Sequence, residues 1–232
     1  MMTSKVHLSE LTFSVLENFA TINSSIVFKK GNIIKTISNA ENILAEYECE
    51  EYFPQDFAIY DLSQFLSGLR ILDDPTLEFG NEDYVVLRGN NIAIKYYYSD
   101  PEITLKVAPD KSVRFPGSNM GFDLDKSLLN KGLNISGKFG FRDLSFCSDG
   151  TSSFINFSDK EMDTSNSCRF DLPNATTTGE YDLNMKVDNL RVYPKASYRV
   201  SVSEHLLSEW VVSDWEGSQD VNLKYYVALE PQ

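Results

Sequence analysis

The feature that most constrains this chain is a pattern that occurs twice along it. The sequence reads YDLSQFLSGLR at Tyr60–Arg70 and YDLNMKVDNLR at Tyr181–Arg191, one copy in each half of the 232 residues. An Asp ahead of apolar residues at helical spacing is typical of a capped helix that follows a strand. The pattern therefore indicates either a duplicated structural unit or one common local arrangement used twice.

The order of the surrounding elements favours duplication. In the first half we expect a helix over Leu8–Ala20, a hairpin turning at 30–32, a strand over 57–62 leading into the helix that begins after Asp61, a hairpin over 84–99 and a strand over 102–108. In the second half we expect a helix over Asp123–Ile135, a hairpin turning at 149–150, the second YDL helix, and strands over 197–203, 209–215 and 221–230. The same sequence of helix, hairpin, helix and strands appears in both halves.

A stretch rich in Pro and Gly separates the halves, since VAPDKSVRFPGSNMG shows no helical or strand period. It predicts an N-terminal domain over 1–108, an inter-domain connector over 109–119 and a C-terminal domain over 120–232. The fold class we expect is α+β: two duplicated domains, each with two helices on an antiparallel β-sheet. Such sheets end in edge strands, and pairing with another copy in a ring is one way to protect them.

Composition and charge limit the possible functions. The chain carries 34 acids and 21 bases, a net charge of −13 that is spread over both halves. An acidic surface repels nucleic acid at long range, so any contact with DNA requires a local basic patch. No apolar run is long enough for a membrane span, and no secretion signal opens the chain, so we expect an intracellular protein.

The sequence offers little for catalysis. It contains no phosphate-binding loop, no dinucleotide fingerprint and no nucleophile elbow, and three scattered cysteines with two histidines form no credible zinc set. Adjacent acids at Asp73-Asp74 and Glu50-Glu51 are typical of solvated loops, although a glycosidase-type pair stays open. We predict a non-enzymatic protein without a cofactor or metal.

Four stretches, collinear and reaching both ends of the chain, resemble a known family. LENFATINSSI at Leu16–Ile26, FAIYDLSQFL at Phe57–Leu66, VAP at Val107–Pro109 and YYVALE at Tyr225–Glu230 are similar to the sliding clamps of T-even-like bacteriophages. The stretch from Glu41 to Gln55 and the loops of 140–170 match that family poorly.

The resemblance implies a DNA polymerase processivity factor. In that family three subunits join head to tail into a ring of six domains, helices line the hole, and duplex DNA threads it. It also implies loading by a separate ATP-dependent clamp loader, and a location in the cytoplasm of the infected bacterial host. Contacts with DNA would be weak, non-specific and directed to phosphates.

The candidate phosphate contacts are bases on the polar faces of the expected helices, with Lys5 ahead of the first helix and Lys138 just beyond the third. They are Lys5, Arg70, Lys126, Lys131, Lys138, Lys186 and Arg191. The first helix departs from the family, because Glu10 and Glu17 stand where lysines are common. We therefore predict that the C-terminal domain makes most of the DNA contact.

The resemblance also implies an apolar pocket near the connector that docks short peptides of the polymerase and its accessory proteins. The candidate residues are Val107, Pro109, Phe115, Pro116, Tyr226, Val227 and Leu229. The plain alternative is that the last three form strand core. A non-catalytic β-rich viral structural or adhesion protein remains the other interpretation of the whole chain.

Overall fold

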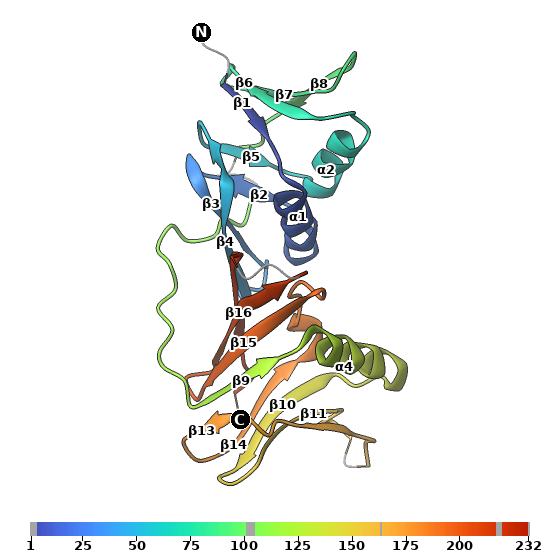
Figure 1. The fold of residues 1–232 in the computed structure, drawn as a ribbon, viewed down its shortest axis with the longest axis vertical. Helices are drawn as coiled ribbons and strands as arrows, with labels where there is room; N and C mark the ends of the chain where they lie inside the picture. Colours follow the sequence, from blue (N-terminus) through green and yellow to red (C-terminus); the bar gives the residue numbers. More distant parts are fainter. Residues whose placement is uncertain (1–3, 101–104, 163, 217–219, 232) are drawn as a thin grey trace. The chain divides into compact units, whose positions relative to one another are not determined.

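The computed structural model describes residues 4–100, 105–162, 164–216 and 220–231, and these form two compact units (Figure 1). Unit 1 spans Met1–Asp110 and unit 2 spans Lys111–Gln232. The division falls within the predicted connector, whose residues carry no helix or strand between Asp110 and Ser118.

Unit 1 contains two α-helices and eight strands among the residues described. Its helices are α1 (Glu10–Ile22) and α2 (Leu62–Arg70); its strands are β1 (Ser4–His7), β2 (Ile26–Phe28), β3 (Gly31–Ile37), β4 (Ile43–Phe53), β5 (Phe57–Ile59), β6 (Thr76–Phe79), β7 (Tyr84–Arg88) and β8 (Ala93–Tyr97). Within the unit, strands pair antiparallel as β1-β6-β7-β8, β2-β5 and β3-β4. Helices α1 and α2 bury apolar faces, with Val15, Leu16 and Phe65 fully covered.

Unit 2 contains one α-helix in the part of the chain described, α4 (Lys126–Phe139), and a short 3-10 helix, η1 (Val187–Asn189). Its strands are β9 (Met120–Leu124), β10 (Asp143–Asp149), β11 (Ser153–Ser158), β12 (Cys168–Asp171), β13 (Thr176–Thr177), β14 (Glu180–Lys186), β15 (Ala196–Ser203), β16 (Leu207–Trp215) and β17 (Asn222–Ala228). They pair antiparallel in the orders β12-β11-β10-β14 and β13-β9-β15-β16-β17.

Sequence patterns located most elements correctly. The first helix, the strand into Asp61 and the helix behind it, the β7-β8 hairpin, the β10-β11 hairpin and the last three strands are all confirmed. Ser9 caps α1 and Asp61 caps α2, each through its side-chain oxygen to a backbone N–H. The antiparallel α+β class is likewise confirmed.

The prediction of a helix at the second YDL pattern is wrong. Residues 180–186 form β14, which pairs with β10 along its whole length, and only η1 follows. Leu183 and Met185 are buried while their neighbours are less covered, a period of two that a strand requires. Unit 2 therefore lacks the second α-helix that we expected at 181–191.

Two further expectations differ from the structure. The strands on either side of the turn at 30–32 exist, but β2 pairs with β5 and β3 pairs with β4, so they form no hairpin. The strand expected over 102–108 falls partly outside the described residues, and 105–108 carry no strand. The long strand β4 was not predicted at all.

Candidate nucleic-acid interface

Helix α4 carries a basic face, a polar stripe with two lysines and no acid. Ser127, Lys131, Asn134 and Lys138 are exposed and lie three or four residues apart, so they form one stripe along the helix. The helix contains three lysines and no acid. This stripe has the chemistry that non-specific phosphate contact requires: cations and hydrogen-bond donors without a competing carboxylate.

Local features hold α4 in place. The Asp125 side chain caps the helix by accepting a 2.7 Å hydrogen bond from the Ser127 N–H. Hydrogen bonds from the Ser127 side chain and from this N–H hold the pKa of Asp125 below its usual range. Gly140 ends the helix in the left-handed conformation, with φ of 72°. Gly132 lies against Phe157 of β11, where an added Cβ would come within 2.6 Å of the ring. The helix therefore packs closely on its sheet and presents the lysines outward.

The lysines of α4 differ in their surroundings. Nζ of Lys126 lies 3.5 Å from the Asp214 carboxylate, and its side chain is 41% exposed. Lys131 and Lys138 are exposed and make no ion pair within the described part of the chain. Lys138, which we placed just beyond the helix, lies in its last turn.

The two candidate bases of unit 1 are each paired with an acid. Arg70, in the last turn of α2, forms an ion pair with Glu17 of α1 and lies 5.1 Å over the Phe13 ring. Lys5 lies on β1, not on a helix, and its Nζ is 2.8 Å from Glu78. These contacts leave α1 and α2 without a basic face comparable to that of α4.

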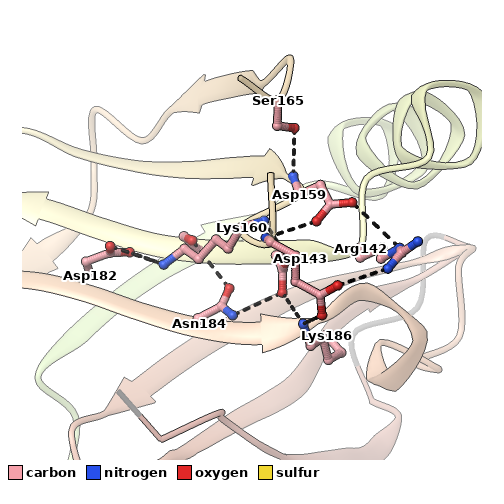
Figure 2. Close-up of polar contacts among 10 residues, drawn as sticks. Arg142, Asp143, Asp159, Lys160, Ser165, Asp182, Asn184 and Lys186 are labelled. Atoms are coloured by element: carbon pink, nitrogen blue, oxygen red, sulfur yellow. Dashed lines mark hydrogen bonds and ion pairs between the residues drawn. The ribbon is translucent and has the colours of Figure 1, made fainter. Parts of the chain in front are cut away.

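Lys186 is held by a buried carboxylate (Figure 2). Asp143 is fully buried and accepts hydrogen bonds from Lys186 Nζ at 2.8 Å, from the Lys160 backbone N–H at 2.8 Å and from Asn184 at 3.2 Å. Burial by itself would raise the pKa of Asp143, but these hydrogen bonds outweigh it and lower the pKa. The same contact raises the pKa of Lys186.

Further ion pairs surround this carboxylate. In Figure 2, Arg142 faces Asp159 and Lys160 reaches Asp182, the acid of the second YDL pattern. Arg191, also expected on a helix, lies beyond η1 and donates to the Asp188 carbonyl. Lys186 and Arg191 therefore do not stand on a helical polar face. No sequence signal linked Asp143 to Lys186, because the two residues meet only through the β10-β14 ladder.

The residues expected to form the peptide pocket are placed in different parts of the chain. Val107 and Pro109 belong to unit 1, and Val107 lines a cavity of about 460 Å³ with Phe57 and Tyr98. In unit 2, Pro116 is exposed and Phe115 is partly covered. Tyr226, Val227 and Leu229 are at most 5% exposed. Their side chains fill strand core, as the alternative interpretation held, and only the Tyr226 hydroxyl reaches the connector, at the Val113 carbonyl.

Other kinds of site find little support in the part of the chain described. No three or more His, Cys, Asp or Glu side chains there are grouped so that they could hold a metal ion. None of the helices described is both long and apolar enough to cross a membrane.

Comparison with known proteins decides between the remaining interpretations. Residues 8–99 match the family model for DNA polymerase processivity factors. The sliding clamp of Vibrio phage KVP40 is 29% identical over 228 residues, which cover 96% of this chain and 98% of the relative. The sliding clamp of Enterobacteria phage T4 is 32% identical over 130 residues, 56% of each chain.

The chain is similar to the phage sliding clamps along nearly its whole length. Solved clamp structures share its fold at much lower identity. Proliferating cellular nuclear antigen from Entamoeba histolytica matches with a TM-score of 0.72 and 13% identity, over 99% of this chain and 98% of that one. The A. fulgidus antigen, solved with the C-terminal region of FEN-1 bound, also gives 0.72, at 15% identity over 100% and 99% of the two chains. The chain therefore has the DNA clamp fold of these solved structures.

Proposed function

We propose that this sliding clamp encircles duplex DNA and tethers the replicative DNA polymerase for processive synthesis. On this proposal the chain catalyses no reaction, and a separate ATP-dependent clamp loader opens and places the ring. It works in the cytoplasm of the infected bacterial host. The curated relatives named as sliding clamps and the processivity-factor family model support this function.

The observation that carries the proposal is the basic face of α4. In a chain with a net charge of −13, a helix with three lysines and no acid is where the phosphate backbone can be approached. Contacts from flexible lysines to phosphates are independent of base sequence and are weakened by salt, as sliding requires. We propose Lys131 as the principal contact, with Lys126 and Lys138 beside it. Lys5, Arg70, Lys186 and Arg191 would contribute less, because each is held by another group.

We propose that three copies close the ring head to tail. Each unit has a four-stranded sheet with an edge strand, β8 in unit 1 and β12 in unit 2, that pairs on one side only among the described residues. Such edges expose backbone groups that a strand of another copy can bind. A contact between unit 1 of one copy and unit 2 of the next is heterologous, so it repeats until a ring closes.

Partner peptides would dock beside the connector, residues 109–119. The members of the expected pocket that are not buried are Val107, Pro109, Phe115 and Pro116. If Phe115 is part of the site, Phe115→Ala should reduce stimulation of the polymerase while the mass of the ring is unchanged. Undiminished stimulation would remove Phe115 from the site.

The test of the function is retention on circular against linear duplex DNA, after loading, with the mass in solution measured in parallel. Topological linkage predicts that the ring stays on closed circles and is lost from the ends of linear DNA. Three chains of 26.3 kDa would give about 79 kDa by light scattering. Equal loss from both DNA forms would contradict encirclement, and a structural virion protein would be retained on neither.

A further inference from the structure

Two features at the surface of this chain are not used by the proposed function. One is Phe139, the last residue of α4, whose side chain is 63% exposed. The other is a cavity of about 400 Å³ in unit 1, at the junction of β1, α1 and the end of α2. One is an exposed aromatic ring, and the other is an open cavity whose lining is only partly apolar.

Phe139 is a rigid projection. Its ring stacks on Phe141 with 5.5 Å between centroids and 15° between planes, and Phe141 is 7% exposed. Gly140, in the left-handed conformation, turns the chain between the two rings, and the stacking on buried Phe141 orients the exposed ring. Rigid aromatic side chains that need little ordering are typical anchors of protein interfaces. Lys138 precedes the ring and adds a positive charge beside it.

The cavity has an apolar floor and an acidic rim. Phe13, Leu69 and Leu72 contribute to the floor, and Glu10, Asp73 and Asp74 to the rim. Arg70 also lines the cavity, but its charge is paired with Glu17. The His7 ring and the Asp74 carboxylate share a hydrogen bond of 2.9 Å, whereas Glu10 and Asp73 form no ion pair within the part of the chain that is described. Ile71, next to the lining residues, is 73% exposed. An aromatic group with a cation beside it complements such a site in polarity and in charge.

We propose that Phe139 of one copy fills this cavity of the next copy, with Lys138 facing its acidic rim. The proposal rests on the ring inferred above and assigns one of its contacts. The exposed ring is in unit 2 and the cavity is in unit 1, so the contact is heterologous and each copy provides both parts. Opposite charges on the two parts, with the acids in unit 1 and the lysines of α4 in unit 2, favour this register over the pairing of like units.

The test is the dissociation of the full-length assembly, followed by light scattering or sedimentation over a dilution series. Phe139→Ala should raise the concentration at which the assembly falls apart by about tenfold or more. Met162→Ala is the matched control, since Met162 is also in unit 2 and is 59% exposed. Circular dichroism of each variant checks that the exposed substitutions leave the fold intact.

Charge exchange provides the second arm. Lys138→Glu and Asp73→Lys should each weaken association, and the double variant should recover most of the loss, because the pair is restored with reversed signs. Losses that simply add would contradict the pairing of these two residues. An unchanged mass for Phe139→Ala would overturn the proposal while leaving the ring itself intact.

The same variant distinguishes other occupants. If Phe139→Ala keeps its mass but binds DNA less tightly, the aromatic ring stacks on nucleic acid, and the proposal is wrong. If it keeps its mass but no longer stimulates the polymerase, a partner protein uses Phe139, and the proposal is again wrong. A wild-type chain that stays monomeric and is not retained on circular DNA would instead contradict the proposed function.

Discussion

The helices of the two units differ sharply in charge. Helix α1 contains Glu10 and Glu17 and no base, and the single base of α2, Arg70, is paired with Glu17. Helix α4 has three lysines and no acid, and its cap Asp125 lies ahead of the first turn. In a duplicated architecture, the element order can persist while the surface chemistry of each copy diverges.

This difference shows what decides whether a base can serve DNA. A lysine on an acid-free helical face is available to phosphate, whereas a base of similar exposure beside a carboxylate must first give up that partner. Arg70 is 62% exposed, yet it faces Glu17. Exposure alone therefore does not identify a phosphate contact; the charges around it do.

The largest expected effect is on the basic face itself. Lys131→Gln with Lys138→Gln should lower affinity for a short duplex by about 100-fold at low salt, since a ring loses both cations in every copy. The slope of log affinity against log salt should become shallower by about one for each phosphate that the variant no longer neutralises. Fluorescence anisotropy over a salt series measures both quantities.

Lys5→Gln with Lys30→Gln is the matched control, because it removes two exposed bases from unit 1. It should change affinity little. If the two double variants lose equal affinity for DNA, the contrast between the units is wrong and both units contact DNA to the same extent.

Lys186 separates a structural base from a DNA-facing one. Lys186→Ala should lower the free energy of unfolding by about 2–4 kcal/mol, because it leaves the buried Asp143 without its cation. The affinity of the folded ring for DNA should stay near that of the wild type. Urea unfolding and anisotropy on the same sample would check this, and a loss of affinity without a loss of stability would return Lys186 to the DNA-facing set.

Two glycines of α4 test how closely this helix must lie on its sheet. Gly132→Ala should destabilise unit 2 by about 1–3 kcal/mol, since the new Cβ would collide with the Phe157 ring. Gly137→Ala should stabilise it by about 0.5–1 kcal/mol, because nothing lies within 4 Å of the added Cβ and Ala favours the helix. Thermal unfolding of the pair measures both, and a stable Gly132→Ala would mean that α4 can shift on its sheet.

Acid should weaken unit 2 through Asp143. Its pKa in the folded chain is lowered, so the stability it adds is present above the unfolded-state pKa of about 3.9 and is lost as pH falls through the folded pKa. Asp143→Asn should be less stable at pH 7 by about 1–2 kcal/mol and should lack this component of acid sensitivity. Unfolding curves from neutral pH down to strongly acidic pH would show it; parallel pH profiles would exclude Asp143 as the cause.

The smallest effect concerns Arg70. Glu17→Gln should raise DNA affinity a few-fold at low salt, because it releases Arg70 and removes a negative charge beside it. Glu82→Gln, which also removes an exposed acid from unit 1, is the control. If both variants raise affinity equally, only the net charge matters and the Glu17–Arg70 pair has no special role.

Local patterns predicted the elements whose stabilising contacts are close in sequence. Helices α1, α2 and α4 have apolar residues at helical spacing and a capping Ser or Asp, and the hairpins β7-β8 and β10-β11 have tight turns. The local patterns failed where the apolar residues of a segment fit both a helical period and a strand period. In YDLNMKVDNLR, Leu183, Val187 and Leu190 suit a helix, but Leu183 and Met185 also suit a strand, and the ladder with β10 decides.

The two YDL patterns show the same limit within three residues. Asp61 caps a helix by accepting from the Gln64 N–H at 2.8 Å, whereas Asp182 forms an ion pair with Lys160 at 3.0 Å. The same residue type has different roles in the two patterns, because the residues that contact it in the folded chain differ. The candidate site divided in the same way: Lys131 and Lys138 follow from their own helix, while the role of Lys186 depends on a residue far along the chain.

The sequence by itself determined the element types of most segments, the family resemblance and the lysines of the third helix, because each is encoded within a few turns of chain. The helix predicted over Asp123–Ile135 still contained two acids, and the structure places both ahead of α4. Only the tertiary structure decided that residues 180–186 form a strand, that Asp143 holds Lys186, that Glu17 holds Arg70, and that the expected pocket residues Val227 and Leu229 are core. These outcomes depend on long-range pairing and burial. A carboxylate pairs with a base when folding brings the two together, and a local sequence pattern does not predict which residues will be brought together.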